Sequence, residues 1–168
     1  LPFSFDITGI VRPGENTLRV SCQDDSDRSF HSRGKQMLDR GGIFYTAQSG
    51  IWQTVWMEWV PETYIEHIRL TPDYDREALH VRVSLRQGIT SPDGAPASAP
   101  SSIRMEARVL SQGRVVTTLS TASTDFSLVI HNFTPWTPEN PFLYDLELRL
   151  LVPASDCVSS YFAMRCFS

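Results

Sequence analysis

Apolar and polar residues alternate with a period of two along much of the chain, and this alternation predicts β-strands. The pattern is clearest over residues 79–85, 103–109 and 144–150, where every second residue is apolar and the residues between are mostly polar or charged. A strand with one buried and one exposed face has this pattern. A shorter run over 126–130 repeats it, and no apolar stripe of helical period reaches a useful length. The predicted fold class is therefore all-β.

Seven short strands are predicted between residue 63 and residue 168. Their number and spacing suit an immunoglobulin-like β-sandwich, although the Cys…Trp…Cys signature of antibody domains is absent. The stretch Ser91–Ser102, which is rich in small and turn-forming residues, is predicted to be a mobile loop between two of them. The predicted strands are Tyr64–Thr71, Ala78–Leu85, Ile103–Leu110, Arg114–Leu119, Asp125–Ile130, Phe142–Leu151 and Asp156–Arg165.

Residues 1–62 contain too few strand segments to close a core of their own. The run Arg12-Pro-Gly-Glu-Asn16 predicts a turn between a strand at Phe3–Val11 and a strand at Thr17–Cys22. The segment Ile51–Val60 is apolar on both faces, and such a strand needs cover on both sides. We therefore expect residues 1–62 to be the second half of a larger β domain whose first half lies upstream of Leu1, with a domain boundary near residue 62.

Charge and composition exclude two classes of partner. The chain is 41% hydrophobic and 20% charged, its net charge is −4, and it has no Lys/Arg run. A protein that binds the phosphate backbone needs a basic patch, so no nucleic-acid partner is expected. The longest apolar stretches are interrupted by polar residues and fall short of a bilayer span, so no membrane association is expected.

The three cysteines do not have the spacing of a metal site or a disulfide framework. Cys157 and Cys166 are expected along one strand, roughly 30 Å apart at about 3.3 Å per residue, too far to bridge. This usage fits a reducing compartment and favours a cytoplasmic location. The chain begins at Leu1 without the features of a leader peptide, so we expect the natural N-terminus to lie upstream, and targeting cannot be inferred.

Seven short motifs occur in an order and spacing that is typical of one enzyme family. With them the chain resembles glycoside hydrolase family 2, the β-galactosidase and β-glucuronidase family. The resemblance covers nearly the whole chain and is weakest over residues 86–125; the two longest motifs together make it specific. The motifs are PFSFDIT (2–8), GENTL (14–18), DSD (25–27), RGKQ (33–36), SGIWQTVW (49–56), WTPENPFLY (136–144) and SYFAMR (160–165).

The resemblance implies a domain order of a jelly-roll sugar-binding domain, an immunoglobulin-like sandwich and a catalytic (β/α)8 barrel. Residues 1–62 would then be the C-terminal part of the jelly roll, and residues 63–168 the immunoglobulin-like domain. The family's two catalytic glutamates, one of which follows an Asn, belong to the barrel, and this sequence has no Asn-Glu pair. The resemblance therefore predicts a non-catalytic fragment that braces the barrel of the same polypeptide, in an enzyme that hydrolyses the O-glycosidic bond of a β-glycoside.

The acidic residues and histidines of the chain offer no catalytic or metal site. A retaining glycosidase needs two carboxylates about 5 Å apart, but the positions of Glu58, Glu62 and Glu66 favour solvated or ion-paired roles. The cluster Asp24–Asp27 does not have the spacing of a calcium loop and favours a turn. The histidines, at positions 31, 67, 80 and 131, lack the spacing of a metal-binding pair. No catalytic residue, cofactor or metal is predicted, and the chain alone is expected to be inactive.

The loop before SGIWQTVW is the best candidate for a sugar contact. In galactosidase and glucuronidase relatives this loop reaches the barrel's pocket and carries an Asp five positions before the small-Gly-Ile triplet; this chain has Phe44 there. A carboxylate that could bind sugar hydroxyls is thus replaced by an aromatic ring. We predict Tyr45 and Gln48 as substrate contacts. For Trp52 and Trp56, packing in the jelly-roll core or against the barrel is the better interpretation. For Tyr45, such packing and a sugar contact are equally good interpretations.

Two further expectations concern how the chain behaves by itself. An alternative to the accessory role is an independent carbohydrate-binding or adhesion module that uses exposed aromatic residues. If residues 1–62 are half of a jelly roll, their apolar strand edges are expected to associate with another copy or to remain partly disordered.

Overall fold

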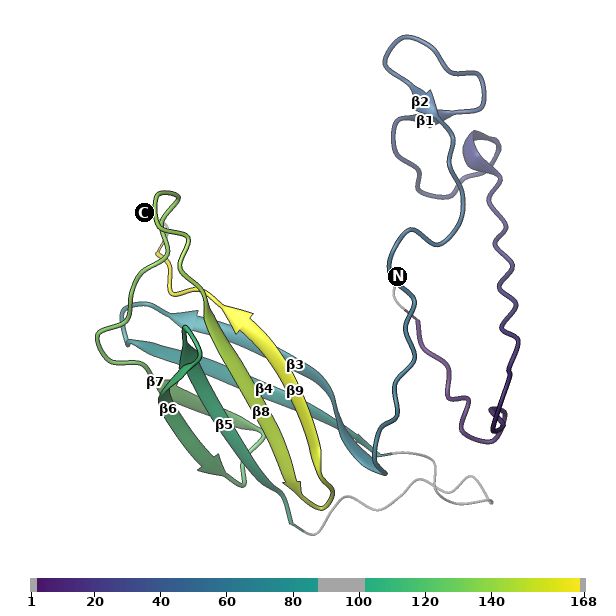
Figure 1. Cartoon of the computed structure of the whole chain (residues 1–168). Helices are drawn as coiled ribbons and strands as arrows, with labels where there is room; N and C mark the ends of the chain where they lie inside the picture. Colours follow the sequence, from purple (N-terminus) through teal and green to yellow (C-terminus); the bar gives the residue numbers. More distant parts are fainter. Residues whose placement is uncertain (1–2, 88–101, 167–168) are drawn as a thin grey trace. The chain divides into compact units, whose positions relative to one another are not determined.

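The computed structural model describes residues 3–87 and 102–166, and the chain divides into two compact units, Leu1–Met57 and Glu58–Ser168 (Figure 1). Over these described ranges, all regular elements are strands apart from one three-residue 3-10 helix. The predicted all-β fold class is therefore confirmed. No helix in this part of the chain is long and apolar enough to cross a membrane.

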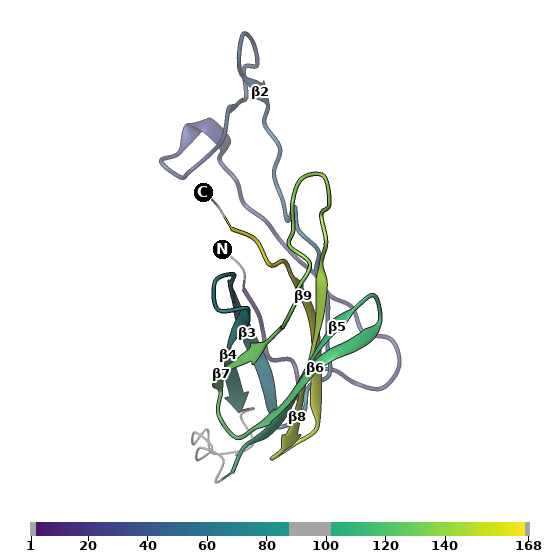
Figure 2. The ribbon, with the colours of Figure 1, turned by 90° about the vertical axis from the view of Figure 1, so that its left-hand side faces the viewer.

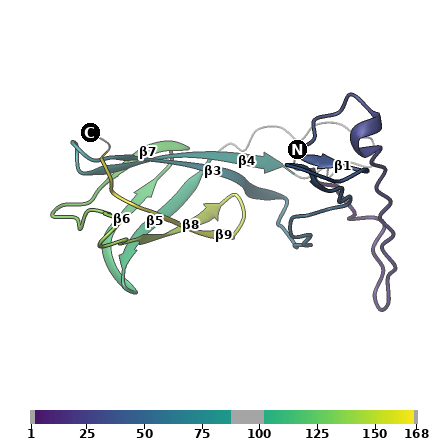
Figure 3. The ribbon, with the colours of Figure 1, turned by 90° about the horizontal axis from the view of Figure 1, so that it is seen from above.

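The second unit is a sandwich of two antiparallel sheets, which form two layers in Figures 2 and 3. One sheet has the order β3-β4-β7 and the other the order β6-β5-β8-β9. All seven strands predicted for residues 63–168 are present, and each end lies within three residues of its predicted position. Their bounds are Thr63–Asp73 (β3), Ala78–Gln87 (β4), Arg104–Ser111 (β5), Arg114–Thr121 (β6), Asp125–Val129 (β7), Tyr144–Val152 (β8) and Asp156–Phe162 (β9).

The core of the sandwich is made of the alternating apolar residues that the sequence pattern assigns to the inner faces. Leu79 and Val81 from one sheet and Leu148 from the other are completely buried. Each such side chain contributes about 1.5–3 kcal/mol by leaving water. The core comprises Ile65, Leu79, Val81, Val83, Met105, Ala107, Val109, Phe126, Leu128, Ile130, Tyr144, Leu146, Leu148, Leu150, Phe162 and Met164.

A loop of residues 130–143 joins β7 to β8 and is held in place by hydrogen bonds. The backbone N–H of Thr134 donates to the hydroxyl of Tyr144, at 2.8 Å. The N–H of Trp136 donates to the carbonyl of Met164, at 2.8 Å, and the guanidinium of Arg165 lies over the Trp136 ring. The last strand was expected to reach Arg165, but it ends at Phe162, because beyond that residue the backbone bonds to this loop and not to β8.

The first unit has little regular structure. It contains the 3-10 helix Ser26–Arg28 (η1) and a short parallel pairing of Gln36–Met37 (β1) with Tyr45–Thr46 (β2). The strands predicted over 3–11, 17–22 and 51–60 are not formed, so these three predictions are wrong. A strand needs a neighbour for its N–H and C=O groups, and no neighbouring strand in the described part of the chain pairs with these segments.

The turn predicted at residues 12–16 is confirmed, because it depends on local bonds alone. Gly14 has a φ of 94°, a conformation that glycine adopts without strain. The side chain of Asn16 accepts a hydrogen bond from the N–H of Arg12 at 3.0 Å and donates one to the carbonyl of Arg12 at 2.7 Å. These bonds form within five residues and require no second strand.

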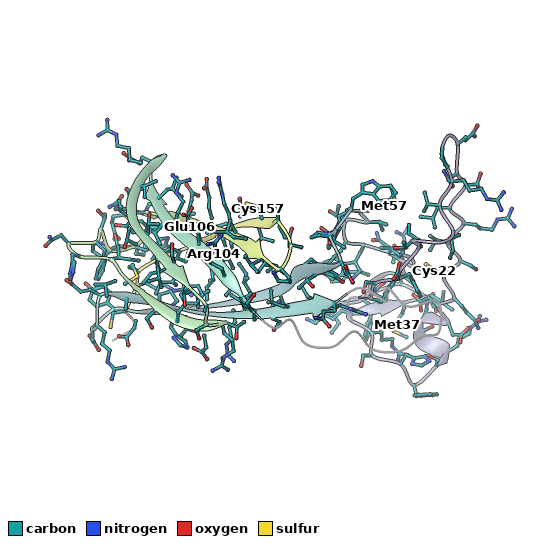
Figure 4. The ribbon with its side chains drawn as sticks, turned by 90° about the horizontal axis from the view of Figure 1, so that it is seen from below. Cys22, Met37, Met57, Arg104, Glu106 and Cys157 are labelled. Atoms are coloured by element: carbon teal, nitrogen blue, oxygen red, sulfur yellow. The ribbon has the colours of Figure 1, made fainter. Side chains whose placement is uncertain are left out.

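Apolar side chains of the first unit are exposed in large numbers. None of residues 3–57 is buried, and Phe30 and Trp52 are 94% and 88% exposed. The side chains of Cys22 and Met57 are likewise exposed, and Figure 4 labels both. Trp52 and Trp56 thus do not pack in a core of the first unit, and packing against the rest of a jelly roll or against a barrel stays a prediction. The loop predicted over 91–102 lies outside the described residues except for Ser102.

Candidate functional site

A small hollow of the first unit lies beside the acidic turn at residues 24–28. Asp24 accepts a hydrogen bond from the backbone N–H of Ser26 at 2.7 Å, and the N–H of Arg28 donates to the carbonyl of Asp25 at 3.0 Å. The segment predicted to be a turn therefore forms one. A hollow of about 80 Å³ opens next to it, lined by Asp24, Ser26, His31, Ser32, Arg33 and Gln36.

The predicted contact loop reaches this same part of the unit. The N–H of Tyr45 donates to the carbonyl of Lys35 at 2.7 Å, and the N–H of Gln48 donates to Oε1 of Gln36 at 2.8 Å. The hydroxyl of Ser49 also hydrogen-bonds to the carboxylate of Asp24. The backbone of Gln48 is therefore held against a residue that lines the hollow, and Tyr45 lies in β2, opposite Gln36 of β1.

The side chains of the two predicted contacts and of Phe44 are open to solvent. Tyr45 is 69% exposed and Phe44 is 42% exposed. Gln48 is exposed as well. An exposed phenol and an exposed amide can each reach a ligand without displacing protein side chains. The contact of Gln48 with Gln36 is a result of the tertiary structure, since the two residues are twelve positions apart in the sequence.

The acidity of Asp24 is clearly changed from its ordinary value. The backbone N–H of Ser26 holds the pKa of its carboxyl below the ordinary value, and the Ser49 hydroxyl and the nearby His31 lower this pKa further. Hydrogen bonds to a carboxylate and positive charge beside it both favour the ionised form. The hollow therefore combines an ionised carboxylate with the guanidinium of Arg33, a pairing of acceptors and donors that suits a polyhydroxylated ligand.

Three lining residues, Ser32, Arg33 and Gln36, were not considered as site candidates from the sequence, and His31 was considered only as a metal ligand. Arg33 and Gln36 belong to the RGKQ motif, which was noted as a motif without a role being assigned. The available signal was the density of polar side chains within residues 24–36, next to an acidic cluster. No group of three or more His, Cys, Asp and Glu side chains in the described part of the chain is arranged to hold a metal ion.

The carboxylates weighed as catalytic candidates are not gathered at a site. Glu58 and Glu62 are exposed, and Glu66 pairs with Arg86 on the neighbouring strand at 2.7 Å. The expectation of solvated or ion-paired roles is confirmed for these three residues.

Other charged groups of the second unit pair across strands on the outer faces of the sheets. Asp125 of β7 accepts from Arg82 at 2.9 Å and lies 3.1 Å from the ring of His80, both on β4. On the other sheet, Arg108 donates to Glu147 at 3.1 Å. Arg104 and Glu106 on β5 and Cys157 on β9 belong to this second sheet as well, and Figure 4 labels them. The charges thus lie outside an apolar core.

Comparison with known proteins identifies the family. The family model of Glycosyl hydrolases family 2 matches residues 63–165. The chain belongs to this family. The match spans the sandwich from the first residue of β3 to three residues beyond the end of β9, and the resemblance inferred from the sequence motifs is confirmed.

Solved structures similar to the family 2 chain include two β-glucuronidases. The β-D-glucuronidase of Dictyoglomus thermophilum is 18% identical, with a TM-score of 0.46 over 62% of this chain and 16% of that one. The β-glucuronidase of Ruminococcus gnavus in complex with D-glucaro-d-lactam is 14% identical, with a TM-score of 0.46 over 64% of this chain and 17% of that one. The chain therefore spans less than a fifth of the length of these structures. A comparison with curated proteins found no match.

Proposed function

We propose that this chain supplies accessory, non-catalytic β domains of a family 2 glycosidase of the β-galactosidase or β-glucuronidase type. Residues 1–62 are the C-terminal part of a jelly-roll sugar-binding domain, and residues 63–168 are an immunoglobulin-like sandwich. Both brace a catalytic (β/α)8 barrel of the same polypeptide, and the full-length enzyme hydrolyses a β-glycoside.

The observation that carries the non-catalytic role is the distribution of polar groups in the sandwich that the family model matches. Within its described residues the interior is apolar, with Thr63 as the single buried polar residue. Retaining glycosidases require two carboxylates about 5 Å apart facing one substrate. The carboxylates of Glu66, Asp125 and Glu147 instead neutralise arginines on outer faces, where they cannot act as such a pair.

The immunoglobulin-like assignment is supported by the topology and by one hydrogen bond. Three strands pack against four in antiparallel sheets, and sandwiches of this class have about seven strands. The bond from Thr134 to the hydroxyl of Tyr144, at the start of β8, resembles the tyrosine corner of immunoglobulin domains.

A direct test of the non-catalytic role is an assay of this chain with nitrophenyl β-galactoside and β-glucuronide. We expect no turnover above the buffer rate. Turnover that disappears in Glu66→Gln or Glu147→Gln, with folding intact, would refute the proposal, because it would make a surface carboxylate catalytic.

A second candidate function, an independent carbohydrate-binding module, is supported by the hollow beside Tyr45 and Gln48. The aromatic ring would stack on a sugar, and the amide would hydrogen-bond to its hydroxyls. Calorimetric titration with galactosides and glucuronides separates the candidates, since a free-standing binder gives saturable heat. Tyr45→Ala and Gln48→Ala should each weaken such binding, whereas Tyr161→Ala, an equally exposed tyrosine in the other unit, should not.

Self-association through residues 1–62 is a further part of this proposal. The exposed apolar residues of the unit, Trp52 and Trp56 among them, would be covered by a second copy when the rest of the jelly roll does not cover them. The double variant Trp52→Ser/Trp56→Ser should then lower the association constant measured by sedimentation equilibrium. A chain that stays monomeric at high concentration would contradict this.

A further inference from the structure

Ser127, His80 and Asp125 form a chain of polar contacts on the outer face of the three-stranded sheet. Ser127 and Asp125 lie on β7, and His80 lies on β4 directly opposite Ser127. The hydroxyl oxygen of Ser127 is 3.2 Å from Nδ1 of His80, and the other ring nitrogen, Nε2, is 3.1 Å from Oδ1 of Asp125. A serine, a histidine and a carboxylate in this order are the groups by which proteins activate a serine as a nucleophile.

The carboxylate of Asp125 decides which ring nitrogen of His80 carries the proton. An ionised carboxylate only accepts hydrogen bonds, so Nε2 must donate to it. In the neutral ring Nδ1 is then the bare nitrogen, and it accepts the hydrogen bond of the Ser127 hydroxyl. Asp125 is fixed in turn by Arg82, whose Nη2 and Nε lie 2.9 Å and 3.0 Å from Oδ2, which leaves Oδ1 to the histidine. Ser127 therefore faces a correctly oriented base.

The backbone N–H of Ser127 points away from β4. Opposite residues in an antiparallel ladder alternate between hydrogen-bonded and non-hydrogen-bonded pairs. The N–H of Val83 donates to the carbonyl of Thr124 at 2.8 Å, so this pair is of the bonded kind. The pair of His80 and Ser127 lies three positions along the same register and is therefore of the other kind. Side chains of non-hydrogen-bonded pairs lie closer together, which accounts for the contact of Ser127 with His80.

The open edge of the sheet leaves this N–H accessible to a ligand. β7 is the last strand of its sheet, and within the described residues no strand pairs with its outer side. In enzymes with an activated serine, the N–H of the serine itself helps to stabilise the oxyanion of the tetrahedral intermediate. Ser127 is exposed, and the side chains of His80 and Asp125 are 42% and 44% exposed. A small substrate can therefore approach the hydroxyl and the N–H from solvent.

We propose that Ser127 is a nucleophile that takes the acyl group of short-chain esters, with His80 as its base and Asp125 as a positioning residue. Oγ of Ser127 forms a bond to the carbonyl carbon of the ester while the hydroxyl proton passes to Nδ1 of His80. The tetrahedral intermediate expels the alcohol, which leaves with that proton, and an acyl-serine remains. A water molecule, deprotonated by His80 in the same way, then releases the carboxylic acid and restores the serine.

The neighbouring side chains favour a short acyl group. Thr71 lies opposite His80 on β3, and Arg69 lies opposite Arg82. A long hydrocarbon chain would gain little by lying on such polar residues.

This activity goes beyond the proposed function. It transfers an acyl group and does not use the pair of carboxylates that glycoside hydrolysis requires. The assays with nitrophenyl glycosides and the test below therefore have independent outcomes.

The test measures the acetylation of individual serines of the full chain by p-nitrophenyl acetate. The reaction is stopped with acid at early times, and mass spectrometry of proteolytic fragments locates the acetyl groups. Ser84 is the internal control, because it is exposed and lies opposite His67 on β3, but among the described residues it lacks the hydrogen bond that joins Ser127 to His80. Ser127 should be acetylated at least about tenfold faster than Ser84, since general-base assistance contributes about 10²–10⁴-fold.

Variants assign the roles. His80→Asn should lower the acetylation rate of Ser127 at least about tenfold, and Asp125→Asn should lower it as well, because the ring then loses its carboxylate partner. His67→Asn, the matched control on the neighbouring strand, should leave the rate unchanged. Thermal unfolding midpoints check that each variant folds.

Three outcomes would overturn the proposal. One is acetylation of Ser127 no faster than that of Ser84. Another is a rate at Ser127 that His80→Asn leaves unchanged in a folded chain, which would remove the histidine as base. The third is an equal loss in His67→Asn and His80→Asn, which would show that the contact of His80 with Ser127 has no specific effect. A rate unaffected by Asp125→Asn would exclude the positioning role of Asp125.

Discussion

At the scale of single residues, the most consequential contact found is the one between Asp156 and Ile65. The backbone N–H of Ile65 on β3 donates to the carboxylate of Asp156 on β9 at 2.7 Å. Ile65 is 7% exposed, so this bond lies at the edge of the core. The bond therefore joins the two sheets at one side of the sandwich. It lies next to the bulge between Ile65 and His67, where the register of β3 with β4 shifts.

Removing this carboxylate should destabilise the sandwich. Asp156→Ala leaves the N–H of Ile65 without its acceptor, and we expect a loss of about 1–3 kcal/mol in the free energy of unfolding. Asp156→Asn keeps an acceptor oxygen and should cost less. Urea unfolding followed by circular dichroism measures both, with Asp145→Asn, an exposed carboxylate on β8, as the control. Equal stability of the Ala and Asn variants would mean that the bond does not contribute as described.

A second residue-scale prediction concerns the acidity of Asp24. In the folded chain the pKa of the Asp24 carboxyl is lowered from its ordinary value of 3.8. The ionised carboxylate therefore stabilises the turn at pH values above 3.8. This stabilisation is lost as the pH falls through the lower pKa of the folded state. A carboxyl titration by NMR should give a midpoint below 3.8 for Asp24. Ser49→Ala should move the midpoint upward, since it removes a donor, and Ser4→Ala, an exposed serine of the same unit, should not. A midpoint unaffected by Ser49→Ala would contradict the bond.

At the scale of elements, the strands of the sandwich form where alternation and tertiary pairing agree. β8 is the clearest case, because it lies between β5 and β9 in its sheet and buries alternate residues. Its inward residues belong to the core and its outward residues include the Glu147 ion pair. The hairpin from β5 to β6 turns through Gln112 and Gly113, both with positive φ, which matches the twist of the flanking strands.

Two leucines of β8 provide a matched test of this alternation. Leu148 is completely buried and Leu151 is 40% exposed. Leu148→Ala should cost about 2–5 kcal/mol of unfolding free energy, through lost burial and the cavity left behind, whereas Leu151→Ala should cost well under half of that. Chemical unfolding of both variants makes the comparison. Similar losses would show that the two faces of β8 are not distinguished as described.

At the scale of the whole molecule, the two units differ in how their apolar residues are used. Among its described residues, the sandwich has sixteen buried apolar side chains in one core, while no residue from 3 to 57 is buried. Cooperative stability comes from a packed core. The free energy of local opening should therefore be higher in the sandwich than in the first unit.

Hydrogen exchange at low protein concentration should separate the units. We expect the amides of β4, β5 and β8 to exchange slowly, at rates set by global unfolding, and those of residues 3–57 to exchange fast. Mass spectrometry of proteolytic fragments measures both. Slow exchange throughout residues 3–57 in a dilute monomer would contradict the expectation and would imply a core in the first unit.

The alternation of apolar residues was enough to predict four of the seven strands and their inward faces, because burial on one face imposes a period of two whatever the neighbouring strand is. The other three strands followed from the spacing of strand-like runs. The turn at residues 12–16 was predictable for a similar reason, since Asn16 and Gly14 form it with local bonds. The family also followed from the sequence, through motifs such as SGIWQTVW and WTPENPFLY.

Only the tertiary structure decided which strand-like segments become strands and which polar residues meet. The segments 3–11, 17–22 and 51–60 have the residue types of strands, yet backbone pairing is a property of two segments, and no described neighbour pairs with them. The contacts of Gln48 with Gln36 and of Ser49 with Asp24 likewise join residues distant in the chain. By itself, the sequence determined the local preference of each segment, the family and the sandwich; long-range pairing, which depends on what lies opposite in space, decided the rest.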